Sequence, residues 1–196
     1  MTPRSVASLR VISDPRLRPI LPSPVLGMLI FVIAEMMMFA GLMSAFTIVK
    51  AGALGWPPPG QPRLPVEVTA FNTAVLLASG VVLFFANRAY ARSPDLAKRL
   101  LFIAIGFGAF FVALQGFEWV SLIRQGLTLT SSNHGSFFFL IVGMHGLHAI
   151  AGLTVLGSAG LKFSKGLLAP SSFAAAQVFW YFVVGLWPLL YFMVYL

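Results

Sequence analysis

A few polar side chains interrupt the long apolar runs of this 196-residue chain, and their types could do chemistry. Glu35 and Glu118 are carboxyls, and His145 and His148 stand three residues apart. A centred charge costs about 2.5 to 3.5 kcal/mol in hydrocarbon, so an ionisable residue there is a functional candidate by default. The remaining polar groups at this depth are Asn72, Gln115 and, at a helix end, His134.

Glu35 lies about ten residues into its apolar run, which corresponds to a depth of about 15 Å in a helix. No Lys or Arg lies at that depth, so burial favours the neutral acid over the carboxylate. Two interpretations remain open. The carboxyl exchanges protons or faces a partner, or it is a protonated acid that hydrogen-bonds to a neighbouring helix.

Glu118 lies near the end of its apolar run, in the more polar segment from Leu114 to Trp119. A carboxyl at that position can reach water, Arg124 or a histidine on a neighbouring helix. We therefore predict a structural hydrogen bond or ion pair for Glu118, in a structural polar network with Gln115, His145 and His148, rather than catalysis.

His145 and His148 are spaced to project from nearly the same face of a helix. Two neighbouring imidazoles cannot clamp one haem iron from opposite sides, and no carboxylate at a suitable spacing completes a zinc set. The chain has no cysteine, which excludes thiolate ligands and disulfides. We expect no metal on this chain, and interpret both histidines as buried, hydrogen-bonded side chains at a close helix contact beside Gly143 and Gly146.

The run of three methionines from Met36 to Met38 suggests copper transport at first sight. Three consecutive residues point in three directions around a helix, so no single face collects their sulfur atoms. Packing is the favoured interpretation of these side chains.

The elements that must position these groups are apolar throughout. Apolar residues make up 59% of the chain, charged residues only 9%, and the mean hydropathy is +0.91. Average soluble domains have about a quarter of their residues charged. Five runs near the length of about 20 residues needed to cross a bilayer predict helices at about 25–49, 68–89, 100–123, 136–161 and 173–196. The expected fold is an all-α integral membrane protein, with a transmembrane domain at 25–196 after an N-terminal extension at 1–24.

The net charge of +8 follows the expected topology. Ten of the 13 basic residues fall in the N-terminal segment and in the second and fourth connections, and three fall on the other side. Because bases accumulate in cytoplasmic loops, we predict a cytoplasmic N-terminus and a C-terminus outside. The bases are spread over short loops instead of one stripe, so we expect no nucleic-acid partner.

The order and spacing of several short motifs resemble subunit III of the haem-copper cytochrome c and quinol oxidases. The resemblance runs from Gly27 to the C-terminus and includes, in order, Ala34-Glu35, Trp56-Pro57-Pro58, Leu64-Pro65-Val66-Glu67-Val68, Asn72-Thr73-Ala74-Val75-Leu76-Leu77-Ala78-Ser79-Gly80, Gln115-Gly116-Phe117-Glu118, Gly135-Ser136-Phe137-Phe138 and His145-Gly146-Leu147-His148. The chain resembles the five-helix bacterial form, which lacks the first two helices of the seven-helix form.

The resemblance implies roles for several residues. Glu35 corresponds to the buried glutamate that carbodiimides modify, and Glu118, His145 and His148 correspond to the other characteristic intramembrane polar positions. One departure occurs in the last helix, where the family usually has Trp-His-Phe-Val-Asp and this chain has Trp180-Tyr181-Phe182-Val183-Val184.

The resemblance also implies a non-catalytic subunit of an enzyme complex in the respiratory chain of the bacterial cytoplasmic membrane. Its partners would be subunits I and II and membrane phospholipids, and its role would be to support stability and proton uptake. Haem and copper are expected in the partner catalytic subunit, which needs six histidines where this chain has three. The alternatives are an accessory subunit of a nitric oxide reductase-type complex and a free-standing proton or solute carrier built around Glu35.

Overall fold

The computed structural model describes residues 21–196 and contains five helices, with no strand among those residues. The helices are α1 (Ser23–Ala51), α2 (Val66–Ala89), α3 (Pro94–Arg124), α4 (Asn133–Ser164) and α5 (Pro170–Tyr195). All five are long and apolar enough to cross a membrane, which confirms the expected all-α membrane fold. Most of the expected N-terminal extension, residues 1–24, lies outside the described residues, and the orientation of the termini stays a prediction.

The helices extend beyond the predicted apolar runs, because the residues at their ends suit the first and last turns of a helix. α1, α3 and α5 carry proline in the first turn, where the missing N–H costs no helical hydrogen bond. α3 and α4 are each followed by a glycine at positive φ, Gly126 and Gly166. Leu127 N–H donates to the Leu122 carbonyl and Leu167 N–H donates to the Lys162 carbonyl, at 3.0 and 2.9 Å. These bonds close both helices in the Schellman motif.

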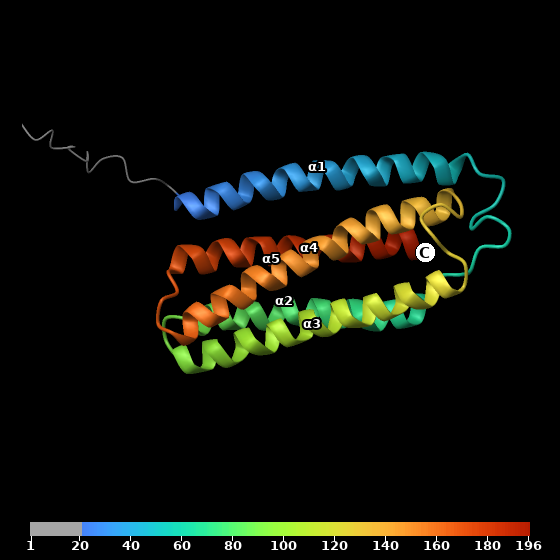
Figure 1. Ribbon diagram of the computed structural model, residues 1–196. Coiled ribbons are helices and arrows are strands. Elements are labelled where there is room, and N and C mark those ends of the chain that lie inside the picture. The colour runs from blue at the N-terminus through green and yellow to red at the C-terminus, as the bar shows by residue number, and fades with distance from the viewer. Residues whose placement is uncertain (1–20) are drawn as a thin grey trace, which may run out of the picture.

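The helices form three layers, with α1 on one side, α4 and α5 in the middle, and α2 and α3 on the other side (Figure 1). α2 and α3 pack closely, whereas α1 contacts α5 and α4 but neither α2 nor α3 in the described structure. α1 buries only a narrow stripe at seven-residue spacing, formed by Val25, Val32, Phe39 and Phe46. This spacing is typical of a helix that packs along one seam.

The beginning of α1 and the end of α5 lie at opposite ends of the bundle (Figure 1). The α2–α3 and α4–α5 connections lie at the end of the bundle where α1 begins (Figure 1). These connections and the helix turns next to them contain Arg88, Arg92, Lys98, Arg99, Lys162 and Lys165. The α1–α2 and α3–α4 connections lie at the opposite end (Figure 1), and Lys50, Arg63 and Arg124 lie in them or in the helix turns next to them. The helix connections therefore keep the two groups of bases apart, as the topology argument requires.

The indole of Trp180 is one of the two largest fully buried side chains and lies where α5 meets α2, α3 and α4. A Cβ atom at Gly108 of α3 would stand 2.6 Å from this indole, and one at Gly152 of α4 would stand 2.9 Å from it. The indole N–H donates to Ser79 Oγ of α2 at 2.9 Å, and the serine hydroxyl donates to the Ala104 carbonyl of α3 at 3.0 Å. Two glycines and one serine thus create the space and the acceptor for one tryptophan.

A second tryptophan repeats this arrangement one layer further along α5. The indole N–H of Trp187 donates to Thr73 Oγ1 of α2 at 2.8 Å, and Thr73 donates to the Thr69 carbonyl at 2.7 Å. A buried indole N–H needs such an acceptor, since an unpaired donor in an apolar interior is costly. The two bonds fix the rotation of α5 against α2.

The close approach at Trp180 generates the first prediction. Gly108→Ala should lower the free energy of unfolding by about 1–3 kcal/mol, because the new methyl group overlaps a rigid, fully buried indole. Gly106→Ala on the same helix is the matched control, because a Cβ there has no neighbouring atom within 4 Å. Thermal denaturation of the two variants after detergent extraction measures the difference, and equal melting temperatures would contradict the packing described here.

Candidate functional site

Glu35 lies near the middle of α1, about 18 Å along the axis from Ser23. Its side chain is 19% exposed and faces α4. The surrounding part of α1 is apolar, and its outer face exposes Ile33, Met36 and Met37. The carboxyl is therefore the one group on this stretch of α1 that needs a polar partner.

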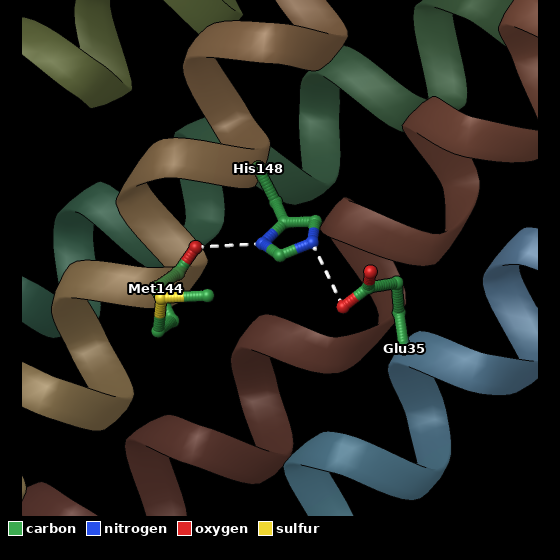
Figure 2. Close-up of polar contacts among 3 residues, drawn as sticks. All are labelled: Glu35, Met144 and His148. Atoms are coloured by element: carbon green, nitrogen blue, oxygen red, sulfur yellow. Dashed lines mark hydrogen bonds and ion pairs between the residues drawn. The ribbon is translucent and has the colours of Figure 1, made fainter.

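His148, at the middle of α4, provides that partner. Its Nε2 lies 3.1 Å from Glu35 Oε2, and its Nδ1–H donates to the Met144 carbonyl at 2.7 Å (Figure 2). Among the described residues, this is the only polar side-chain contact between α1 and another helix. The sequence predicts His148 in one network with Gln115 and Glu118, whereas the structure places it against Glu35.

The hydrogen bond to Met144 determines which ring nitrogen of His148 carries the proton of a neutral imidazole. A carbonyl oxygen only accepts, so the proton of a neutral imidazole lies on Nδ1 and Nε2 is left to accept. A single proton in the 3.1 Å contact would be carried either by the carboxyl of Glu35 or by Nε2 of an imidazolium. Both forms have zero net charge, so the pair as a whole avoids the cost of an isolated charge in hydrocarbon.

Aromatic rings surround the imidazole of His148. The ring centroids of Phe39, Phe182 and Phe179 lie 5.5, 6.0 and 6.2 Å from that of His148. The three phenylalanines come from α1 and α5, so the pair lies inside the seam between these helices and α4. In such an apolar setting each of the two side chains needs a polar partner, and each is the partner of the other.

Gln115 and Glu118 belong to a second network that ties α2, α3 and α5 together. Gln115 Nε2–H donates to Glu118 Oε2 at 3.0 Å and to the Tyr195 hydroxyl at 3.1 Å. Glu118 Oε2 also accepts from the Thr69 hydroxyl at 3.1 Å. Asn72 donates to the Phe111 carbonyl at 3.1 Å. No charged base takes part among residues 21–196, and the structural role of Glu118 stays a prediction.

Thr69, Thr73, Ser79 and Tyr195 were missed when only strongly polar residues were considered. On α2 a signal was available, because Thr69, Asn72, Thr73, Leu76, Ser79 and Leu83 recur at intervals of three and four and are all buried. Small hydroxyl side chains on the same stripe as buried leucines indicate helix contacts in a membrane. For Tyr195, at the end of α5, no comparable sequence signal exists.

His145 joins neither network. It is 1% exposed, its ring lies 4.9 Å from that of Trp187 at an interplanar angle of 30°, and neither ring nitrogen has a hydrogen-bond partner among the described residues. The offset of three residues turns His148 towards α1 and His145 towards α3 and α5. His134 lies far from both, at the beginning of α4, with its ring 5.1 Å from that of Trp56.

No group of three histidine, cysteine, aspartate or glutamate residues comes close enough to hold a metal ion within residues 21–196. The three histidines occupy three separate environments, as described above. The described residues therefore form one contact pair, Glu35 with His148, and one hydrogen-bonded network that joins α2, α3 and α5.

Tyr181 and Val184 replace the usual His and Asp of the last helix, and other residues bond α5 to α2. Val184 packs against Gly80, where a Cβ atom would stand 3.0 Å from Val184 Cγ1. The hydroxyl of Tyr181 is buried and has no hydrogen-bond partner in the described structure. Besides the bonds of Trp180 and Trp187, Gln177 donates to Asn87 at 3.2 Å and Tyr191 donates to the Val66 carbonyl at 3.2 Å.

The fold and these contacts define a five-helix membrane protein whose intramembrane carboxyls are held by neighbouring helices. Comparison with known proteins specifies the family. The family model described as cytochrome c oxidase subunit III matches residues 22–196. The chain is 34% identical over 174 residues to a probable cytochrome c oxidase subunit 3 of Nocardia farcinica (strain IFM 10152), covering 85% of this chain and 86% of that protein. It is 38% identical over 181 residues to the cytochrome c oxidase subunit 3 of Madoqua guentheri, covering 86% of this chain and 67% of that protein. The chain belongs to the cytochrome c oxidase subunit III family.

The contact between Glu35 and His148 generates the second prediction. In Glu35→Gln the amide N–H can still donate to Nε2 of His148, so the free energy of unfolding should change by less than about 1 kcal/mol. Glu35→Leu removes the donor and should lower the free energy of unfolding by about 1–3 kcal/mol. Thermal denaturation in nanodiscs is the measurement, and Met37→Leu, at a position 72% exposed on the same helix, is the control. Equal destabilisation by Gln and Leu would instead mean that the pair is ionised, because an amide cannot replace a carboxylate beside an imidazolium.

Proposed function

We propose that the chain is an accessory subunit of a haem-copper terminal oxidase in aerobic respiration. The observation that carries this proposal is the match to the subunit III family over all five helices. In this role the chain docks on subunit I, with subunit II in the same complex, in the cytoplasmic membrane of a bacterium. Haem and copper reside in the partner catalytic subunit, and this chain binds neither.

Proton uptake is the part of this role that the Glu35–His148 pair supports. The pair brings two titratable groups into contact at mid-depth, on a helix attached to the bundle by a narrow seam. Glu35 is the candidate for proton exchange, and Glu118, Gln115, His145 and His148 have structural roles. An assembled complex that carries Glu35→Gln separates proton exchange from a structural role, because the amide keeps the contact with His148 and cannot titrate. Its turnover should fall most at high pH, where protons are scarce.

Phospholipid binding has support at the end of the bundle where α1 begins. A groove of about 290 Å³ lies between α1, α4 and the beginning of α5, with apolar walls from Met28, Val155 and Leu168. Lys162 and Ser158 also line it. An ammonium group beside an apolar groove suits a lipid phosphate followed by its acyl chain. We propose that a structural phospholipid occupies this groove.

Copurification tests the accessory-subunit proposal. The chain, tagged and extracted in a mild detergent, should elute with a haem-containing complex whose optical spectrum is that of a haem-copper oxidase. The separated chain should then show no haem absorption and no stoichiometric copper or iron. Purification of the chain alone would favour the free-standing carrier, and the spectrum of a nitric oxide reductase would favour the other alternative.

Thiol labelling tests the proposed orientation, in which the N-terminus is cytoplasmic and the C-terminus outside. The chain has no cysteine, so a single introduced thiol reports its own side. Ser93→Cys, in the exposed α2–α3 connection, should react with an impermeant reagent only after cells are opened. Leu54→Cys, in the exposed α1–α2 connection, should react in intact spheroplasts. The opposite result would reverse the topology.

A further inference from the structure

A hollow of about 320 Å³ lies at the end of the bundle where α1 ends and α2 begins. Its walls come from the ends of α1, α2, α4 and α5 and from the α1–α2 connection. α1 has 29 residues and is about 44 Å long, whereas the hydrocarbon of a bilayer is about 30 Å thick. Lys50, which lines the hollow, is the second-last residue of α1. The hollow therefore faces the aqueous phase beyond the hydrocarbon.

Two bases line this hollow, and no carboxylate of the described chain pairs with them. Lys50 is half-buried and Arg63 is exposed. Within residues 21–196, the one ion pair joins His148 to Glu35, so neither base has a carboxylate partner there. The α1–α2 and α3–α4 connections, at residues 52–65 and 125–132, contain no aspartate or glutamate. The hollow therefore keeps a positive potential that suits an anionic group from another molecule.

Aromatic rings hold the basic and apolar walls of the hollow in place. Lys50 Nζ lies 5.6 Å from the ring centroid of Phe46, which attracts the ammonium group. The Phe46 ring packs edge-on against Trp56 at 5.5 Å, and Trp56 packs against His134 at 5.1 Å. Phe46 is fully buried, so this stack is anchored in the core. A ligand of the hollow would lose little affinity to the ordering of its walls.

The walls suit a polypeptide better than a phospholipid. A phospholipid needs an apolar groove that runs from its phosphate down the side of the bundle. The residues that line this hollow all lie in the α1–α2 connection or at the very end of a helix, so no such groove leads into the hydrocarbon. Trp56, Arg63 and Tyr195 belong to the residue types that dominate binding energy at protein interfaces.

We propose that this basic hollow is the docking site for an acidic segment of a partner polypeptide outside the hydrocarbon. A carboxylate of the segment pairs with Lys50 and Arg63, and an adjoining apolar side chain packs against Trp56. Such charge pairs fix the orientation of a partner more than they add to its affinity. The inference deepens the proposed function and rests on it, because it requires that the chain is one subunit of a larger complex.

Zero-length crosslinking tests this docking site. The sequence has four lysines, and the other three, Lys98, Lys162 and Lys165, lie at the opposite end of the bundle. A water-soluble carbodiimide activates a carboxylate, and a lysine amine in contact with it then forms an amide. Membranes are treated before extraction, and mass spectrometry of the purified tagged chain maps the product. Lys50 should be joined to an aspartate or glutamate of another polypeptide, with a lower yield in about 1 M salt.

Three variants identify the groups responsible. Lys50→Arg keeps the charge but has no reactive amine, so the product should disappear while the chain stays in its complex. Arg63→Gln should lower the yield about two- to fivefold, as expected for the loss of one exposed ion pair. Arg124→Gln is the matched control, because Arg124 is an exposed base at the same end that does not line the hollow. Its yield should equal that of the wild type, and an equal loss in both glutamine variants would overturn the proposal.

Two further results would also overturn the docking site. One is the absence of any product at Lys50, which a phospholipid in the hollow would give, because the reagent does not join an amine to a phosphodiester. The other is a product only with a carboxyl of this chain. The proposed function fails separately. A product at Lys50 that depends on Arg63 but joins a polypeptide of a complex without haem would support the docking site and contradict the oxidase role.

Discussion

The buried indole of Trp180 is the contact on which the arrangement of the bundle depends. It fills the space left by Gly108 and Gly152 and donates to Ser79, so α2, α3, α4 and α5 meet at one side chain. In a bilayer, helix association depends on close packing and on interhelical hydrogen bonds, since lipid tails are as apolar as the helices. Both contributions are combined here. The rotation of α4 that brings Gly152 to the indole also determines where the histidines of the same helix point.

α1 depends on a different contact. It packs along a narrow stripe against α5 and α4, and its one polar side-chain contact with them in the described structure joins Glu35 to His148. The two networks divide the bundle accordingly. Gln115, Glu118, Thr69 and Tyr195 stabilise the packing of α2, α3 and α5, whereas Glu35 and His148 connect the outlying helix to that core. A change in the protonation of this pair would therefore act on the least buried helix of the five.

Family membership and the geometry of the chain support the proposed role in different ways. The family match concerns the whole transmembrane region and carries the proposal that the chain is an oxidase subunit. The geometry concerns particular groups, namely the Glu35–His148 pair on α1 and α4, the lysine-lined groove beside α1 and the basic hollow where α1 ends. The first two features lie where α1 meets α4, and the third lies at the end of the bundle where α1 ends and α2 begins.

The sequence by itself determined the five spanning helices, the distribution of the bases and the short list of polar residues at depth. Those properties are local, because hydropathy and charge add up along the chain whatever the neighbours are. It did not determine which polar residues meet. The sequence predicts His145 and His148 on nearly the same face and in one polar network, yet a step of three residues on α4 turns one to α3 and α5 and the other to α1. Only the tertiary structure decided this, because the partner of a side chain depends on how each helix is rotated against the next, and the glycines and tryptophans of other helices set that rotation.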